Sequence, residues 1–183
     1  MMDKTLRTYV DHIRSNDKDL QNKAYSYLLD ATDQPVDWSY EVWDEMLAGL
    51  THKDNHVRAI SAQILSNLAK SDPKKRMLRD FDKLLDVTKD ERFVTARHCL
   101  QSLWKIGVSG KKQQKMYMDG LERRFKECIN EKNWSLIRYD ILQSMRNVYD
   151  NVKDETIREK ALELIDSEQD SKYKKKYEGL WRK

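Results

Sequence analysis

Two clusters of side chains in this sequence are of the types that perform chemistry. His52 and His56 flank Asp54 at a spacing that metal-binding pairs use, and His98 precedes Cys99, a base next to a thiol. Metal-binding histidines four residues apart need a helix, whereas the first cluster falls in a turn expected between two helices. Neighbouring residues on a helix point in different directions, so the base and the thiol diverge. The sequence therefore predicts no metal site, no cofactor and no catalytic residue.

Apolar residues recur in a pattern that indicates repeated helices. Val57 is followed by Ala62, Leu65 and Leu68, and these four residues share one helical stripe. Similar stripes begin at four other anchor positions, Leu20, Thr95, Ile137 and Tyr173. The anchors are 36 to 42 residues apart, which is the period of helical-repeat architectures.

Each interval between anchors has room for a second amphipathic helix before the anchored one. These first helices are expected at Lys4–Ser15, Trp38–Leu50, Pro73–Thr88, Lys111–Asn130 and Glu155–Ser167. The Asp72-Pro73 pair supports the third of them, because an N-cap residue followed by proline favours helix initiation. The approximate repeats are 3–32, 37–70, 72–107, 111–150 and 154–182, and we interpret 1–183 as one repeat domain.

Composition and charge exclude several classes of protein. Only 5 Gly and 2 Pro occur in 183 residues, far below the roughly 12% of average usage, and this disfavours folds that depend on tight turns. No stretch has the apolar length of a membrane helix, and two cysteines indicate a reducing, cytoplasmic environment. Residues 1–56 carry 11 acidic and 6 basic side chains, whereas residues 171–183 carry 6 basic and 1 acidic. The chain therefore has an acidic head and a basic tail.

The sequence resembles the HEAT-repeat (armadillo-like) proteins. The resemblance rests on Val57-Arg58 and Ile137-Arg138, on the preceding Asp54, and on the Ala and Leu spacing after each anchor. It implies a right-handed α-solenoid of about five antiparallel helix pairs, in which neighbouring pairs bury each other's apolar faces. Thr95-Ala96 and Tyr173-Lys174 depart from the anchor dipeptide of this family.

In HEAT-like solenoids the anchored helices usually line a concave face, so their polar residues are the candidate binding site. These residues are Arg58, Arg97, His98, Gln101, Lys105, Arg138, Tyr139, Asp140, Gln143 and Arg146. Half of them are Arg or Lys, and a groove that they shared would attract phosphates or acidic peptides. The resemblance also implies the alternative that Arg58 and Arg138 pair with aspartates such as Asp54 and Asp90 in a ladder between repeats. For the other cations the alternative is simple solvation.

The architecture is also similar to that of HEAT-like alkylpurine DNA glycosylases. That family holds an aspartate beside aromatic residues to stabilise the sugar cation formed during base excision. Trp134, Tyr139 and Asp140 give a comparable set, with Arg138 available for phosphate. Tyr139 and Asp140 are adjacent on one helix, however, and point about 100° apart.

We therefore expect an all-α, monomeric interaction or scaffold module that binds a protein or an acidic peptide on its concave face. We expect it not to be an enzyme and not to contact a membrane. The alternative function is DNA binding, with glycosylase-like activity as its catalytic form.

Overall fold

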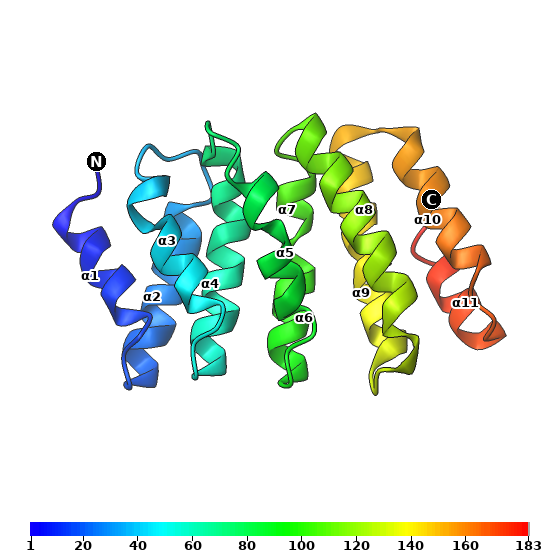
Figure 1. Cartoon of the computed structure of the whole chain (residues 1–183), viewed down its shortest axis with the longest axis horizontal. Coiled ribbons are helices and arrows are strands. Elements are labelled where there is room, and N and C mark those ends of the chain that lie inside the picture. The colour runs from blue at the N-terminus through cyan, green and yellow to red at the C-terminus, as the bar shows by residue number, and fades with distance from the viewer. Residues whose placement is uncertain (183) are drawn as a thin grey trace. The chain divides into compact units, whose positions relative to one another are not determined.

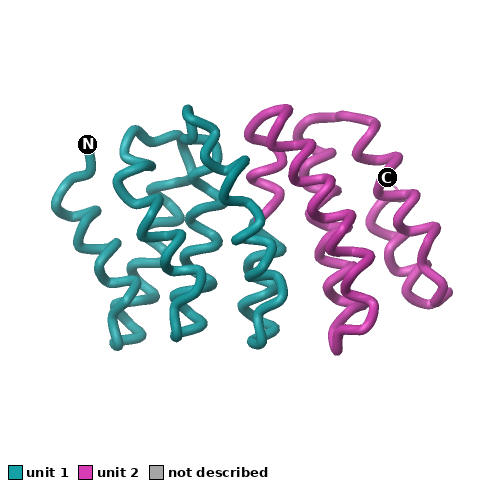
Figure 2. The backbone as a smooth tube through the Cα atoms, in the orientation of Figure 1, with its two compact units in different colours: residues 1–102 teal, residues 103–183 magenta. Residues whose placement is uncertain are grey.

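The computed structural model describes residues 1–182. Within this range the regular secondary structure is entirely helical, which confirms the all-α prediction. The chain forms two compact units, unit 1 (Met1–Ser102) and unit 2 (Leu103–Lys183), shown in Figure 2. The interpretation of residues 1–183 as one repeat domain stays a prediction, and each unit is described by itself.

Unit 1 is a stack of paired helices. Its elements are α1 (Lys4–His12), α2 (Lys18–Ala31), α3 (Ser39–Gly49), α4 (Asn55–Leu68), the short 3-10 turn η1 (Ala69–Ser71), α5 (Met77–Val87) and α6 (Phe93–Ser102). The first helix of each pair lies against the second, and the second helices α2, α4 and α6 also contact one another in sequence (Figure 1). These three second helices form the layer that carries the candidate site.

Unit 2 repeats the same arrangement. Its elements are α7 (Trp104–Gly107), α8 (Lys111–Glu127), the 3-10 turn η2 (Cys128–Asn130), α9 (Trp134–Val152), α10 (Glu155–Asp166) and α11 (Ser171–Glu178). Helix α9 contacts α8, α10 and α11. The described residues contain the pairs α1/α2, α3/α4 and α5/α6 in unit 1 and the pairs α8/α9 and α10/α11 in unit 2, in agreement with the five pairs that the sequence predicts.

The anchored stripes form most of the core, as the sequence pattern predicts. The stripe from Val57 to Leu68 and the stripe from Ile137 to Val148 are buried. The first and the last stripes depart from this pattern, because Leu20, Tyr25, Tyr173 and Leu180 are only half-buried. In the first stripe Gln21 is buried instead. The Gln21 side-chain amide donates to the carbonyl of Ile13 at 2.8 Å. A buried amide that satisfies a backbone group is stable, yet an apolar pattern does not reveal it.

The predicted start of the helix at Pro73 is wrong by four residues. Helix α5 begins at Met77, after Lys75 adopts a left-handed backbone with φ 54°. The Asp72 carboxylate accepts hydrogen bonds from the backbone N–H groups of Arg76 and Met77, each at 2.8 Å. Asp72 therefore accepts hydrogen bonds from backbone N–H groups at the start of α5 that have no partner within the helix, although it lies five residues before Met77 and not directly before the helix.

Helices α3 and α4 approach each other closely at Gly49. A Cβ atom on Gly49 would lie 2.0 Å from the hydroxyl oxygen of Ser61. Gly49 is therefore needed for this approach, and the contact holds α4 tightly on its first-helix partner.

Candidate functional site

The start of α4 is held by a polar cluster around Asp54. The carboxylate caps α4 by accepting from the backbone N–H of His56 at 2.9 Å, and it also accepts from Gln21 at 3.2 Å and Lys18 at 3.1 Å. Burial opposes ionisation, but these hydrogen bonds outweigh it and hold the pKa of Asp54 well below its usual range. Asp54 therefore joins the first helix pair to the second and fixes where α4 begins.

Arg58 forms the ladder that the resemblance implies. Its Nε and Nη2 atoms donate to both oxygens of Asp90, at 2.6 and 2.9 Å, and Nη1 donates to the carbonyl of His52 at 2.8 Å. Asp90 in turn accepts from the backbone N–H of Arg92 at 2.9 Å, just before α6. Burial raises the pKa of Asp90, but these donors more than compensate and lower it overall. The ladder sets the position of α6 relative to α4.

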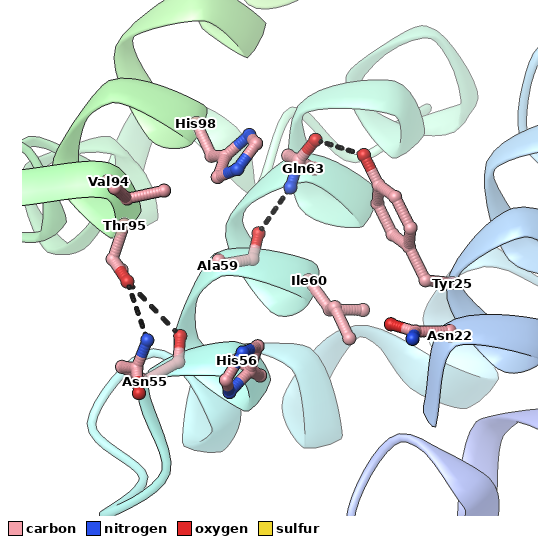
Figure 3. Close-up of a pocket in the computed structure, with 10 residues that line it drawn as sticks. All are labelled: Asn22, Tyr25, Asn55, His56, Ala59, Ile60, Gln63, Val94, Thr95 and His98. Atoms are coloured by element: carbon pink, nitrogen blue, oxygen red, sulfur yellow. Dashed lines mark hydrogen bonds between the residues drawn. The ribbon is translucent and has the colours of Figure 1, made fainter. Parts of the chain in front are cut away.

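Between these second helices lies a pocket with a cavity volume of about 200 Å³ (Figure 3). Its floor is α4, where Ala59 and Ile60 are the central residues, and its two walls come from α2 and α6. The lining residues are Asn22, Tyr25, Asn55, His56, Ala59, Ile60, Gln63, Val94, Thr95 and His98. None of these ten side chains is a Lys, Arg, Asp or Glu, so the pocket combines apolar and neutral polar groups and carries no fixed charge.

Some polar groups of the pocket hold one another in place. The Tyr25 hydroxyl donates to Gln63 Oε1 at 2.7 Å, and Gln63 Nε2 donates to the carbonyl of Ala59 at 3.1 Å. Burial raises the pKa of Tyr25, and the hydrogen bond to Gln63 offsets part of this shift. Tyr25 therefore stays neutral near pH 7 and keeps the α2 wall in a defined conformation.

Other groups at the rim are available to a ligand. Asn22 and His98 are exposed and form no hydrogen bond or ion pair with the described residues. Val94, on the α6 wall, is 66% exposed. The rim of the pocket therefore offers a ligand both an apolar contact and unused hydrogen-bonding groups.

The structure places only one sequence-predicted site residue, His98, in this pocket. Arg58 is engaged in the ladder described above. The Arg97 guanidinium lies 5.9 Å from the ring centroid of Phe93. The Lys105 Nζ atom lies 5.9 Å from the ring centroid of Trp104, and the Gln101 side chain is exposed. Whether these residues bind a ligand stays a prediction.

In unit 2 the candidate residues Arg138 and Arg146 make hydrogen bonds and ion pairs within the fold, as Arg58 does in unit 1. Arg138 is buried: Nη1 donates to Glu168 at 2.7 Å and Nε donates to the carbonyl of Phe125 at 3.1 Å. Arg138 therefore has a ladder role, with Glu168 instead of an aspartate as its partner. Arg146 donates to Asp150 at 2.9 Å and to the carbonyl of Leu180 at 3.1 Å.

Two residues of the glycosylase-like set, Tyr139 and Asp140, point in different directions, as their adjacency on one helix predicts. Tyr139 is half-buried, with the Lys176 Nζ atom 4.9 Å from its ring centroid, whereas Asp140 is buried at 3% exposure. Gln143 donates to Asn147 at 3.0 Å along the same helix. Tyr139 and Asp140 therefore do not lie on the same face of α9.

Sequence reasoning missed most of the pocket. Ala59, Asn22 and Val94 were not candidates, because none of them carries a charge or a nucleophile. A usable signal was nevertheless present: Val94 is an apolar residue just outside the anchored stripe, where a solvent-facing residue is expected.

Residues 1–182 contain no group of three or more His, Cys, Asp or Glu side chains that could hold a metal ion. None of the helices in the described part of the chain is long and apolar enough to span a bilayer.

Comparison with known proteins shows the fold class. No protein-family model and no curated protein matches this chain. Among solved structures, a chain of the complex of CpcE and CpcF of phycocyanin lyase from Nostoc sp. PCC7120 matches with a TM-score of 0.63 and 14% identity, covering 96% of this chain and 97% of that one. An engineered protein matches with a TM-score of 0.56 and 18% identity over 98% of this chain and 80% of its own. A second engineered protein has a TM-score of 0.51 and 14% identity over 98% and 96%.

These likenesses support the HEAT-like helical-repeat resemblance and give no support to the glycosylase resemblance. The expectation that the chain is not an enzyme is wrong in the light of the first match, because the same fold occurs in a complex named for lyase activity. The sequence argument relied on the absence of a recognisable nucleophile and base. In a helical-repeat protein, however, a site can be assembled from neutral residues of several repeats, and such a site leaves no local motif.

Proposed function

We propose that this chain is a protein-binding module whose unit 1 pocket, over α4, receives a short extended segment of a partner protein. The observation that carries the proposal is the combination of the exposed Val94 with the unused hydrogen-bonding groups of Asn22 and His98 around one cavity. Helical-repeat proteins use the layer of second helices as an extended binding surface. The pocket gives that general role a specific location.

The lining indicates which chemistry the segment brings. Val94 and Ile60 offer apolar contact, so the segment carries an apolar side chain toward the floor at Ala59. The Asn22 amide and the His98 imidazole can each donate and accept. An extended peptide backbone presents an N–H and a C=O at every residue, and it therefore satisfies both groups without needing a particular side chain.

The same lining residues indicate that electrostatic attraction is not the main source of binding affinity at this pocket. Binding to nucleic acid depends on Lys and Arg contacts to phosphates and weakens steeply with salt. The ten lining residues include neither type. A neutral, partly apolar segment fits this pocket better than either DNA or the acidic peptide that the sequence suggested.

Selection from a random peptide display library tests the proposal. We expect selected peptides to bind the purified chain, with affinity changing less than about twofold over a salt range in which phosphate-dependent binding falls by orders of magnitude. Val94→Asp should weaken binding by about tenfold or more, since it places a charge against an apolar contact. His98→Ala should weaken it by a smaller factor through the loss of one hydrogen bond.

Leu78→Asp is the matched control. Leu78 is also an exposed apolar residue of unit 1, at 37% exposure, but it lies on the first helix α5 and outside the pocket. Val94 is near the start of α6, where an acidic residue is favourable to the helix, so the test variant keeps its fold. Peptides that bind both variants equally well, or duplex DNA that outcompetes them, would contradict the proposal.

A further inference from the structure

A second surface with a different chemistry lies on unit 2, between α9 and α11. We name it the α9–α11 basic surface, and it consists of Lys172, Tyr173, Lys175 and Lys176 on α11 together with Tyr139 on α9. Lys172, Lys175 and Lys176 are exposed, and both tyrosines are half-buried. Positions 172, 175 and 176 are three and four residues apart, so the three ammonium groups share one side of the helix.

The acidic residues nearby do not neutralise these lysines. Glu168 is buried against Arg138, Asp166 pairs with Lys174 at 3.0 Å, and Glu178 pairs with Arg182 at 3.3 Å. Asp170 is committed to capping α11, where it accepts from the backbone N–H groups of residues 172 and 173 at 2.9 and 3.3 Å. Within the described residues none of the three lysines has an acidic side chain in ion-pair distance.

Like charges on one helix face repel each other, and an anionic partner would relieve that repulsion. Two of the three lysines also lie against aromatic rings: Lys176 Nζ is 4.9 Å from the Tyr139 centroid, and Lys172 Nζ is 5.6 Å from the Tyr173 centroid. These contacts hold the ammonium groups at defined positions over a partly apolar base. The arrangement is therefore more specific than a merely solvated helix end.

We propose that the α9–α11 basic surface binds a short acidic segment of a partner protein. Helix α11 has 8 residues, or about 12 Å of length, which an extended peptide of about four residues spans. Such a peptide can bring two or three carboxylates to three lysines. This site is separate from the unit 1 pocket and does not depend on the function proposed there.

Two observations favour a peptide over a nucleic acid. Stable duplex binding usually neutralises about six to ten phosphates, more than three lysines can supply. Single-strand binding needs open aromatic faces for base stacking. Here each tyrosine has a lysine over its ring, and Trp134 is held edge-on to Tyr173 at a centroid distance of 5.0 Å.

Fluorescence anisotropy with a labelled oligoglutamate peptide tests the inference on the full chain. We expect binding at about 20 mM salt that weakens at about 200 mM, as surface electrostatics require. Lys172→Glu with Lys176→Glu should reduce affinity about tenfold or more, since each change removes an attraction and adds a repulsion. The control Lys112→Glu with Lys132→Glu makes the same change in net charge at two exposed lysines elsewhere in unit 2 and should leave affinity within about twofold.

Three results would overturn the inference. The first is equal loss of affinity in the two double variants, which would mean that only net charge matters. The second is tighter binding of an equally charged DNA strand than of the peptide. The third is salt-sensitive self-association, seen by light scattering and abolished by the test variant, which would make a second copy the occupant. Val94→Asp should not change oligoglutamate binding, so failure here and failure of the proposed function can be told apart.

Discussion

Replacing Arg58 with methionine would leave the Asp90 carboxylate with one side-chain partner fewer in a site where only 5% of that side chain is exposed. Arg58 itself is 13% exposed, and it donates to both carboxylate oxygens. Removing one partner of a buried ion pair typically costs about 3–5 kcal/mol, because the remaining charge is uncompensated. The backbone N–H of Arg92 still reaches Asp90, so we place the loss near the lower limit, at about 3 kcal/mol.

Urea unfolding followed by circular dichroism measures this loss. Arg79→Met is the matched control, since Arg79 is 72% exposed although it also pairs with an aspartate; its cost should stay below about 1 kcal/mol. The double variant Arg58→Met with Asp90→Leu should recover most of the stability, because no unpaired charge is then left in the site. A loss below about 1 kcal/mol in Arg58→Met, or no recovery in the double variant, would refute the ladder as the element that joins α4 to α6.

Three further predictions concern the stability and reactivity of the fold. The pKa of Asp90 is lower in the folded chain than its ordinary value of 3.8, so ionised Asp90 contributes fully to folding stability above that pH, and this contribution is lost as the pH falls below it. The free energy of unfolding should therefore decrease less steeply with falling pH in Asp90→Asn than in the unsubstituted chain. Gly49→Ala should lower the urea midpoint through its clash with the Ser61 hydroxyl, and Ser61→Gly should restore part of it; an unchanged midpoint contradicts the close approach. Cys99 is fully buried, and burial raises its pKa far above the usual range; an aromatic disulfide reagent should label it only after denaturation.

The fold was largely predictable because its main signal is local. Each anchored helix carries an apolar stripe, and the residues from Val57 to Leu68 are enough to define its period. The predictions failed where a polar side chain performs a structural task. Gln21 is buried because it reaches the Ile13 carbonyl, and α5 begins late because Asp72 caps it from a distance. Both effects depend on which backbone group lies nearby in space.

The site was less predictable for a related reason. Charged residues of the second helices attract attention in a sequence, yet Arg58 and Arg138 are paired with acids about 30 residues further along the chain. Whether a cation is paired or available depends on the alignment of neighbouring repeats, which the sequence leaves undetermined. The pocket, in contrast, is lined by residues without a fixed charge, which do not stand out in the sequence. Ala59 and Val94 are individually unremarkable residues and become significant only where α4 and α6 lie side by side.

Methyl NMR of the chain with a display-selected peptide tests the central proposal most directly. Ile60 and Val94 lie in the pocket of unit 1, whereas Ile129 is an exposed methyl-bearing residue in unit 2, at 43% exposure. We predict that titrating the peptide shifts the methyl signals of Ile60 and Val94 together, along one binding curve, and leaves the signal of Ile129 in place. Saturable binding with no movement of the Ile60 and Val94 signals would contradict the account.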